Sequence, residues 1–337
     1  MTLLVTTTRA LWCVDPATTR GYRVDDANGS YYGITHDDDA IYVAARRSGY
    51  AAGKQSPRDQ RGVILVFDAA LELQDTLIPP FALRDLHQLY CFDGALWAVC
   101  TYGDAIAVLR DGQWDLWHPL GAPADAGGEP YHFNSIHAAG DVIYVAGSVD
   151  RVGAVWAFDR GDRRYLRSWR LGYGTHNVWD ENGEIHVLSS LAGCELDGAG
   201  QARAISPGNF VRGAALGEAW RWYGISTRAK RDDRETSDAM LLGIAVANGA
   251  RRHLNLRGDG MVHEIRIPGT LDRAHPAHRG PQIDLTALRA RCEAQALDGP
   301  ACLPARADLG WLAEAAVQKL DRCRRWWHLR RDPAIVV

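Results

Sequence analysis

The sequence lacks long hydrophobic runs, a strong net charge and paired cysteines. No segment approaches the roughly 18 consecutive apolar residues of a membrane span, and the start MTLLVTTTRALWCVD has no basic or long apolar region typical of a signal peptide. The formal charge of -3 provides no basic field for nucleic acid. The seven cysteines include no CxxC pair, as expected for thiols in a reducing compartment. We therefore expect a cytoplasmic protein with no nucleic-acid partner and no membrane span.

Several motifs of common enzyme classes are also absent. The chain has no P-loop, no GxSxG and no HExxH sequence. The glycine-rich segment 197–208 lacks the spacing of a dinucleotide fingerprint and is typical of a loop. The sequence therefore predicts no nucleotide cofactor.

A short unit recurs along the chain, with an apolar strand, a turn containing Asp or Gly, and a second alternating strand. Its copies begin at Tyr32, His87, Asn134 and His176, with a weaker fifth copy at Arg212. In the first four copies, nine residues separate this first position from the apolar residue that opens the second strand, namely Ile41, Leu96, Ile143 and Ile185. Further strand-like runs follow each copy, which gives four antiparallel strands in a repeat of roughly 40 residues.

Four strands per repeat predict an all-β fold, a β-propeller of six blades, with seven as the alternative. The sixth blade needs both ends of the chain, with residues 261–267 joining three N-terminal strands so that no sheet edge stays open. We expect the propeller to span 1–280. Helical spacing of apolar residues after 281 predicts a C-terminal extension, 281–337, of two helices packed on the propeller. Its basic, Trp-rich end, 322–331, fits a docked helix, with a membrane-surface or partner helix as the alternative.

The repeat register predicts a site at one mouth of the central channel. The first strand of each blade lines this channel, so the register position recurs around one mouth. Its residues are Tyr32, His87, Asn134, His176 and Arg212, with Gln88, His132 and Asn177 as neighbours. Such a strand is expected to be mostly apolar, so a polar ring in phase indicates a binding site, with ordered water as the alternative. His36 and His137 lie further along their strands, about 10 Å deeper or more, and we expect structural roles for them.

These residue types favour an enzyme that acts on a small polar molecule, sugar-like or carboxylated. His87 and His176 are suited to acid/base chemistry near neutral pH, Arg212 to holding an anion, and Asn134 to orienting a substrate. We expect Tyr32, Gln88, His132 and Asn177 to contact the substrate in a lyase, isomerase or hydrolase. A divalent metal on His87 and His176 is a second hypothesis, with Asn134, His132 or Glu264 as third ligand. A third is a non-catalytic scaffold for a protein or glycan.

Two long loops bear on this site. Residues 45–61 and 226–240 separate the second and third strands of two blades, and we expect both to project over the ring. They are rich in Arg and Lys, which suits a lid over an acidic or hydroxylated ligand.

Five segments carry a resemblance to a known group. DLHQL (85–89), HFNSI (132–136), THNVW (175–179), FVRGAA (210–215) and YGIS (223–226) follow in order. This series resembles uncharacterised bacterial propeller proteins with DVH, HLNG, PHS, RGLA and VGLS motifs. Ser135 replaces their usual Gly and Asn177 their usual Ser. The resemblance implies a site at His87, Asn134, His176 and Arg212 but no particular reaction. Six-bladed lactonase-type propellers are more loosely similar, and this sequence shows no match to their acidic metal ligands.

Overall fold

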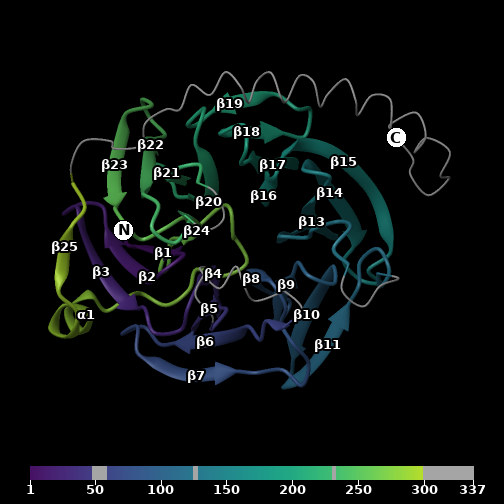
Figure 1. Cartoon of the computed structure of the whole chain (residues 1–337), viewed down its shortest axis with the longest axis horizontal. Coiled ribbons are helices and arrows are strands. Elements are labelled where there is room, and N and C mark those ends of the chain that lie inside the picture. The colour runs from purple at the N-terminus through teal and green to yellow at the C-terminus, as the bar shows by residue number, and fades with distance from the viewer. Residues whose placement is uncertain (48–58, 124–127, 230–232, 299–337) are drawn as a thin grey trace. The chain divides into compact units, whose positions relative to one another are not determined.

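The computed structural model describes residues 1–47, 59–123, 128–229 and 233–298. They belong to one compact unit, Met1–Leu303, whereas a second unit, Pro304–Val337, lies outside the described residues together with the second predicted helix. Within the first unit, six antiparallel sheets are arranged in a ring (Figure 1). The fold is therefore a six-bladed β-propeller, as the repeat predicts.

Five blades follow one another along the chain, each with its first strand innermost. Blade 1 consists of β4 (Tyr31–His36), β5 (Ile41–Ala45), β6 (Val63–Phe67) and β7 (Leu73–Leu77). Blade 2 consists of β8 (Leu86–Phe92), β9 (Ala95–Cys100), β10 (Ala105–Arg110) and β11 (Gln113–Trp117). Blade 3 consists of β12 (Ser135–Ala139), β13 (Val142–Val149), β14 (Val152–Asp159) and β15 (Tyr165–Tyr173). Blade 4 consists of β16 (Thr175–Glu181), β17 (Glu184–Ser189), β18 (Cys194–Asp197) and β19 (Ala202–Ala204). Blade 5 consists of β20 (Phe210–Leu216), β21 (Trp220–Ser226), β22 (Ala239–Ala245) and β23 (Arg251–Leu256).

Blade 6 joins the two ends of the folded region. Its inner strand, β24 (Val262–Arg266), pairs with β1 (Leu3–Thr7), and β2 (Leu11–Asp15) and β3 (Arg20–Asp25) follow outward. The pairing Val5↔Ile265 is antiparallel and brings together residues from opposite ends of the sequence. This arrangement confirms the predicted closure of the ring.

The segment after β24 forms one short helix and one more strand. The helix α1 (Leu285–Arg291) is capped by Asp284, whose side chain accepts the backbone N–H groups of Thr286 and Ala287. It ends at Cys292, and β25 (Ala294–Ala296) then pairs with β3 as a fifth strand of blade 6. The apolar residues at helical spacing therefore continue beyond the end of the helix. The helix stops because the chain instead pairs with the backbone N–H and C=O groups at the open edge of β3.

Six clusters of buried apolar side chains form the core, one between each pair of neighbouring blades. Successive residues of a strand contribute to different clusters: Leu4 faces blade 1, whereas Leu3 and Val5 face blade 5. Both faces of each middle strand are thus buried, which explains why a strand such as ALWAVC in β9 is apolar throughout.

Five inner strands carry a β-bulge at their mouth end. The bulges lie between Tyr31 and Ile34, Leu86 and Leu89, His176 and Val178, Val211 and Ala214, and Val262 and Glu264. In each, the inner strand has one more residue than its partner. A bulge turns side chains away from strict alternation. Two successive residues of one strand can therefore both reach the channel.

The described cysteines, Cys13, Cys91, Cys100, Cys194 and Cys292, are unpaired thiols. Burial raises the pKa of Cys13 and Cys100 to about 12, so these thiols are poor nucleophiles. No helix within the described ranges is long and apolar enough to cross a membrane.

Candidate functional site

Six residues, one from the inner strand of each blade or directly before it, form what we call the mouth ring: Tyr32, His87, Asn134, His176, Arg212 and His263. Ring contacts join members from different blades. The ring centroid of Tyr32 lies 3.9 Å from that of His263 and 5.3 Å from that of His87, and the centroid of His87 lies 6.3 Å from that of His176. The structure thus places side by side residues that are far apart in the sequence.

His263 is the ring member that the sequence did not assign. It occupies in β24 the position that His87 and His176 occupy in β8 and β16. The copies of the repeat are recognised by the turn and second strand that follow, and β24 has neither, because its partner β1 comes from the N-terminus. The polar pair His263–Glu264, which matches His87–Gln88 and His176–Asn177, was the available signal.

Hydrogen bonds fix the tautomer of His87. Its Nδ1 lies 2.8 Å from the Asp85 carbonyl oxygen and 2.7 Å from Thr101 Oγ1. The Thr101 hydroxyl donates to the Phe133 carbonyl at 2.5 Å, so it accepts from His87. Both partners require a proton on Nδ1, whereas Arg46 Nη2, which can only donate, lies 3.1 Å from the same nitrogen. The two shorter contacts assign the proton to Nδ1, which leaves the lone pair on Nε2.

The other two ring histidines follow the same pattern. His176 Nδ1 lies 2.8 Å from the Gly174 carbonyl oxygen and 2.9 Å from Ser190 Oγ. His263 Nδ1 lies 2.7 Å from the Tyr31 carbonyl oxygen in blade 1. The network thus assigns the proton to Nδ1 in all three imidazoles and the lone pair to Nε2.

All three imidazoles are neutral at pH 7. Burial lowers the pKa of His87, His176 and His263 well below the ordinary value, and the positive charge of Arg212 lowers it further. A neutral imidazole with a lone pair on Nε2 can accept a proton or bind a metal ion. Three such groups therefore meet at one mouth of the channel.

Two arginines supply positive charge at the same place. The Arg212 guanidinium lies 5.3 Å from the centroid of the Tyr32 ring, and that of Arg46 lies 3.5 Å from it. Arg46, which directly follows β5, also pairs with Asp85 at 2.5 Å and donates to the Leu86 carbonyl oxygen at 3.2 Å. The sequence pointed to Arg212, whereas Arg46 was noticed only as part of an Arg-rich loop.

Asn134, predicted to orient the substrate, and Gln88 and Asn177, predicted to contact it, all use their carboxamides within the protein. Asn134 donates to the Thr175 carbonyl oxygen at 2.7 Å and accepts from Ser135 Oγ at 2.7 Å. Gln88 Oε1 accepts the Ile136 N–H at 2.7 Å. Asn177 Oδ1 accepts the Gly213 N–H at 2.9 Å. These side chains connect neighbouring blades beneath the histidines.

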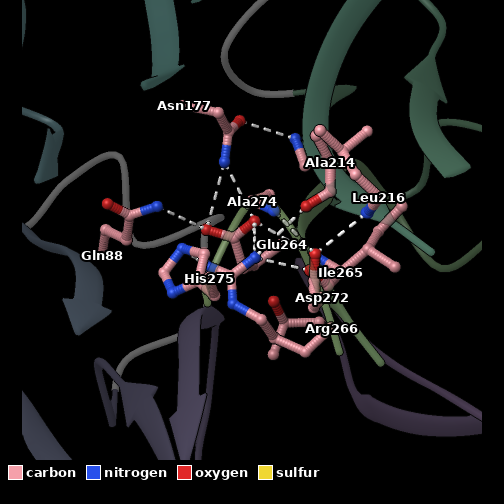
Figure 2. A network of polar contacts seen from close by, with 12 residues as sticks. Gln88, Asn177, Ala214, Leu216, Glu264, Ile265, Arg266, Asp272, Ala274 and His275 are labelled. Atoms are coloured by element: carbon pink, nitrogen blue, oxygen red, sulfur yellow. Dashed lines mark hydrogen bonds and ion pairs between the residues drawn. The ribbon is translucent and has the colours of Figure 1, made fainter. Parts of the chain in front are cut away.

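Glu264 is the centre of a buried network one residue deeper than the ring (Figure 2). It accepts from Gln88 Nε2 at 3.0 Å and from Asn177 Nδ2 at 2.9 Å, so blades 2, 4 and 6 meet on one carboxylate. Arg266 Nη1 pairs with the same carboxylate at 2.9 Å and also contacts backbone carbonyl groups. The network links the inner strands of three blades directly next to the mouth-ring histidines in the sequence.

His132 stands at the rim of the ring. Its side chain is 38% exposed, lies near Glu129 (Nδ1 to Oε2 3.6 Å), and its ring centroid is 5.9 Å from that of His87. Of the two long loops predicted to cover this face, residues 48–58 and 230–232 lie outside the described residues. Their role as a lid stays a prediction.

The geometry gives a partial test of the metal hypothesis. In the described part of the chain, three metal-ligating side chains lie within 4.8 Å of one another only at Glu181, His186 and Glu195 of blade 4. Those two carboxylates already pair with Arg221 and Arg203, so we interpret the group as a charge network. In the described residues His87 and His176 do not belong to such a group of His, Cys, Asp or Glu side chains, and a metal ion on them, with Asn134, His132 or Glu264 as third ligand, stays a prediction.

No protein-family model and no curated protein matches this sequence. A chain from a nidogen/laminin complex is structurally similar, with a TM-score of 0.56, 10% identity, and coverage of 79% of this chain and 97% of the other. A protein of unknown function from Bacteroides caccae gives a TM-score of 0.56, 11% identity and the same coverages. A virginiamycin B lyase from Staphylococcus aureus reaches a TM-score of 0.45 at 12% identity, over 66% of this chain and 76% of the other, too low to carry an argument. These likenesses support the fold alone.

Proposed function

We propose that this protein is an enzyme that abstracts a proton next to a carboxylate of a small polar molecule, as a lyase or an epimerase does. The reaction takes place at the mouth ring, and the unpaired thiols fit a cytoplasmic setting. The observation that carries this proposal is the set of three neutral imidazoles with their lone pairs on Nε2, gathered around Arg212. A single buried histidine is common in folded proteins. Three histidines with the same tautomer beside one guanidinium group, that of Arg212, are not needed for folding.

The parts of the ring have complementary roles. Arg212 holds the substrate carboxylate and stabilises the negative charge that develops when the neighbouring C–H bond breaks. His87 and His176 have ring centroids 6.3 Å apart, so both can reach one small substrate. Either imidazole can accept the substrate proton on Nε2 and, once protonated, return a proton to the substrate. His263 and Tyr32 complete the wall. Asn134, Gln88 and Asn177 position these groups through the contacts between blades.

Exchange of a substrate proton with solvent tests the proposal. The protein is incubated in D2O with D-glucuronate, D-galacturonate or D-gluconate, and the proton next to the carboxylate is followed by NMR. We expect its signal to decay with the unmodified protein, and to decay at least tenfold more slowly with His87→Gln or His176→Gln. His253→Gln, on the outer strand β23, is the matched control and keeps the exchange rate.

Two results would count against the proposal. One is the absence of exchange with all three acids. The other is an unchanged rate in both His87→Gln and His176→Gln, provided that circular dichroism shows both variants folded.

A further inference from the structure

A cavity lies at the opposite end of the channel from the mouth ring. It has a volume of about 440 Å³, within the usual range of small-molecule sites. Its walls are the turns β8–β9 and β12–β13, the residue Asp180 of β16, and residues 276–278 of the segment after β24. His87 and Phe92 stand at the two ends of β8, about 16 Å apart at 3.3 Å per residue, so the two sites are separate.

His137 lines this cavity and is fully buried. Burial lowers its pKa to about 3, with a further contribution from the charge of Arg266, so the ring is neutral. The Ala274 carbonyl group approaches the ring and slightly opposes that lowering, but neither ring nitrogen has a hydrogen-bond partner in the described part of the chain. Both nitrogens are enclosed by protein atoms, so His137 forms part of the wall of this cavity and offers no hydrogen bond to a ligand inside it.

The charge at the rim of the cavity differs from that of the mouth ring. Arg160 Nε donates to Asp93 Oδ2 at 2.6 Å and its Nη1 to the Gly140 carbonyl oxygen at 2.8 Å, which ties the two turns together. Asp180 adds a second carboxylate. With histidines counted as neutral, two carboxylates and one guanidinium give the lining a formal charge of -1, which disfavours an anion.

The lining mixes hydrogen-bond donors, acceptors and small apolar patches. Asp93 and Asp180 accept hydrogen bonds, and Arg160 donates them. Phe92, Ala138 and Pro276 provide apolar surface. A hydroxyl group also donates and accepts, and a sugar ring presents several hydroxyls beside apolar C–H faces. We propose that this cavity binds a neutral monosaccharide unit, independently of the reaction at the mouth ring.

Saturation-transfer NMR with three probes tests this proposal on the full chain: methyl β-D-glucopyranoside, methyl β-D-galactopyranoside and methyl α-D-mannopyranoside. We expect transfer to at least one glycoside. Ala139→Trp, which fills the cavity without removing a polar group, abolishes it. Asp180→Ala, which removes a carboxylate acceptor from the lining, weakens binding at least tenfold.

The control is His176→Gln at the mouth ring, which leaves glycoside binding unchanged while it slows exchange of the acidic probes. The two proposals can therefore fail separately. No transfer with any of the three glycosides would overturn the cavity proposal, as would transfer that persists unchanged in Ala139→Trp. If Asp180→Ala does not fold, the Ala139→Trp variant decides the outcome.

Discussion

Replacing Glu264 by glutamine tests the buried network beneath the mouth ring. The carboxylate lies 2.9 Å from Arg266 Nη1, and neither side chain is more than 3% exposed. Glutamine offers one oxygen and an NH2 group, so one side of the network becomes a contact between two donors. Arg266 then keeps a buried charge without its closest partner, which costs about 3–5 kcal/mol. We expect about 3 kcal/mol, because the Asp272 carboxyl group also interacts with Arg266 and offsets part of the loss.

Urea unfolding at pH 7, with a fitted free energy and m-value, measures this loss. The matched control is Glu72→Gln, because Glu72 also lies 2.9 Å from its partner, Arg291, but the two side chains are 58% and 35% exposed. An exposed pair of this kind is worth about 0–1 kcal/mol. Equal losses in the two variants would refute the interpretation that burial gives the Glu264 network its strength.

Three further substitutions test buried features of the fold by their effect on stability. Burial lowers the pKa of His36 to about 4 and of His137 to about 3, whereas both are ordinary in the unfolded chain. The contribution of these neutral rings to the free energy of unfolding is therefore fully present above pH ~6.5, and it falls towards pH 4 by about 1.4 kcal/mol per pH unit for each histidine. A His36→Asn/His137→Asn double variant is expected to show a flatter dependence of the urea midpoint on pH. Gly33→Ala places a methyl group 2.4 Å from the Leu89 backbone nitrogen, so we expect a loss of about 1–3 kcal/mol or more in urea unfolding. Thr101→Val removes the acceptor beside His87 Nδ1 and costs about 1–3 kcal/mol by the same assay, while Thr101→Ser stays within about 1 kcal/mol of the unmodified protein. An unchanged pH slope would contradict the burial of neutral His36 and His137. Unchanged stability of Gly33→Ala or of Thr101→Val would contradict the close backbone approach at Gly33 or the hydrogen bond of Thr101 to His87.

The sequence was sufficient for the blade repeat and for five members of the mouth ring. The repeat has a fixed distance between its first position and the next strand, so Tyr32, His87, Asn134 and His176 can be aligned without a structure. The alternation of residues 261–267, which follow the last repeat, predicts the strand that closes the ring. The two-sided burial of the strands then follows from the apolar runs.

The bulges were not predictable from alternation. A regular strand sends only every second residue to the channel, yet both His176 and Asn177 take part in the network. Asn177 has φ 52° and Gly213 has φ 83°, which are values that Asn and Gly tolerate best. A polar pair followed by an apolar strand was therefore the available signal for a bulge.

Tertiary contacts decided the remaining features. The end of α1 depends on the open edge of β3, and Arg46 becomes part of the site only because Asp85 of the next blade pairs with it. Neither contact leaves a local pattern in the sequence. The cavity at the opposite end of the channel likewise depends on the segment after β24. Contacts such as the hydrogen bond that the Leu216 N–H donates to Asp272 hold this segment in place.

The protonation state of the mouth ring is the most direct test of the proposed chemistry. Long-range proton–nitrogen NMR of the 15N-labelled protein, with each histidine assigned by substitution, reports which ring nitrogen carries the proton. We predict that His87, His176 and His263 are neutral with the proton on Nδ1 at pH 7 and remain so at pH 6.5, because burial and Arg212 lower their pKa. Charged rings at pH 6.5 or above, or protons on Nε2, would contradict the proposal.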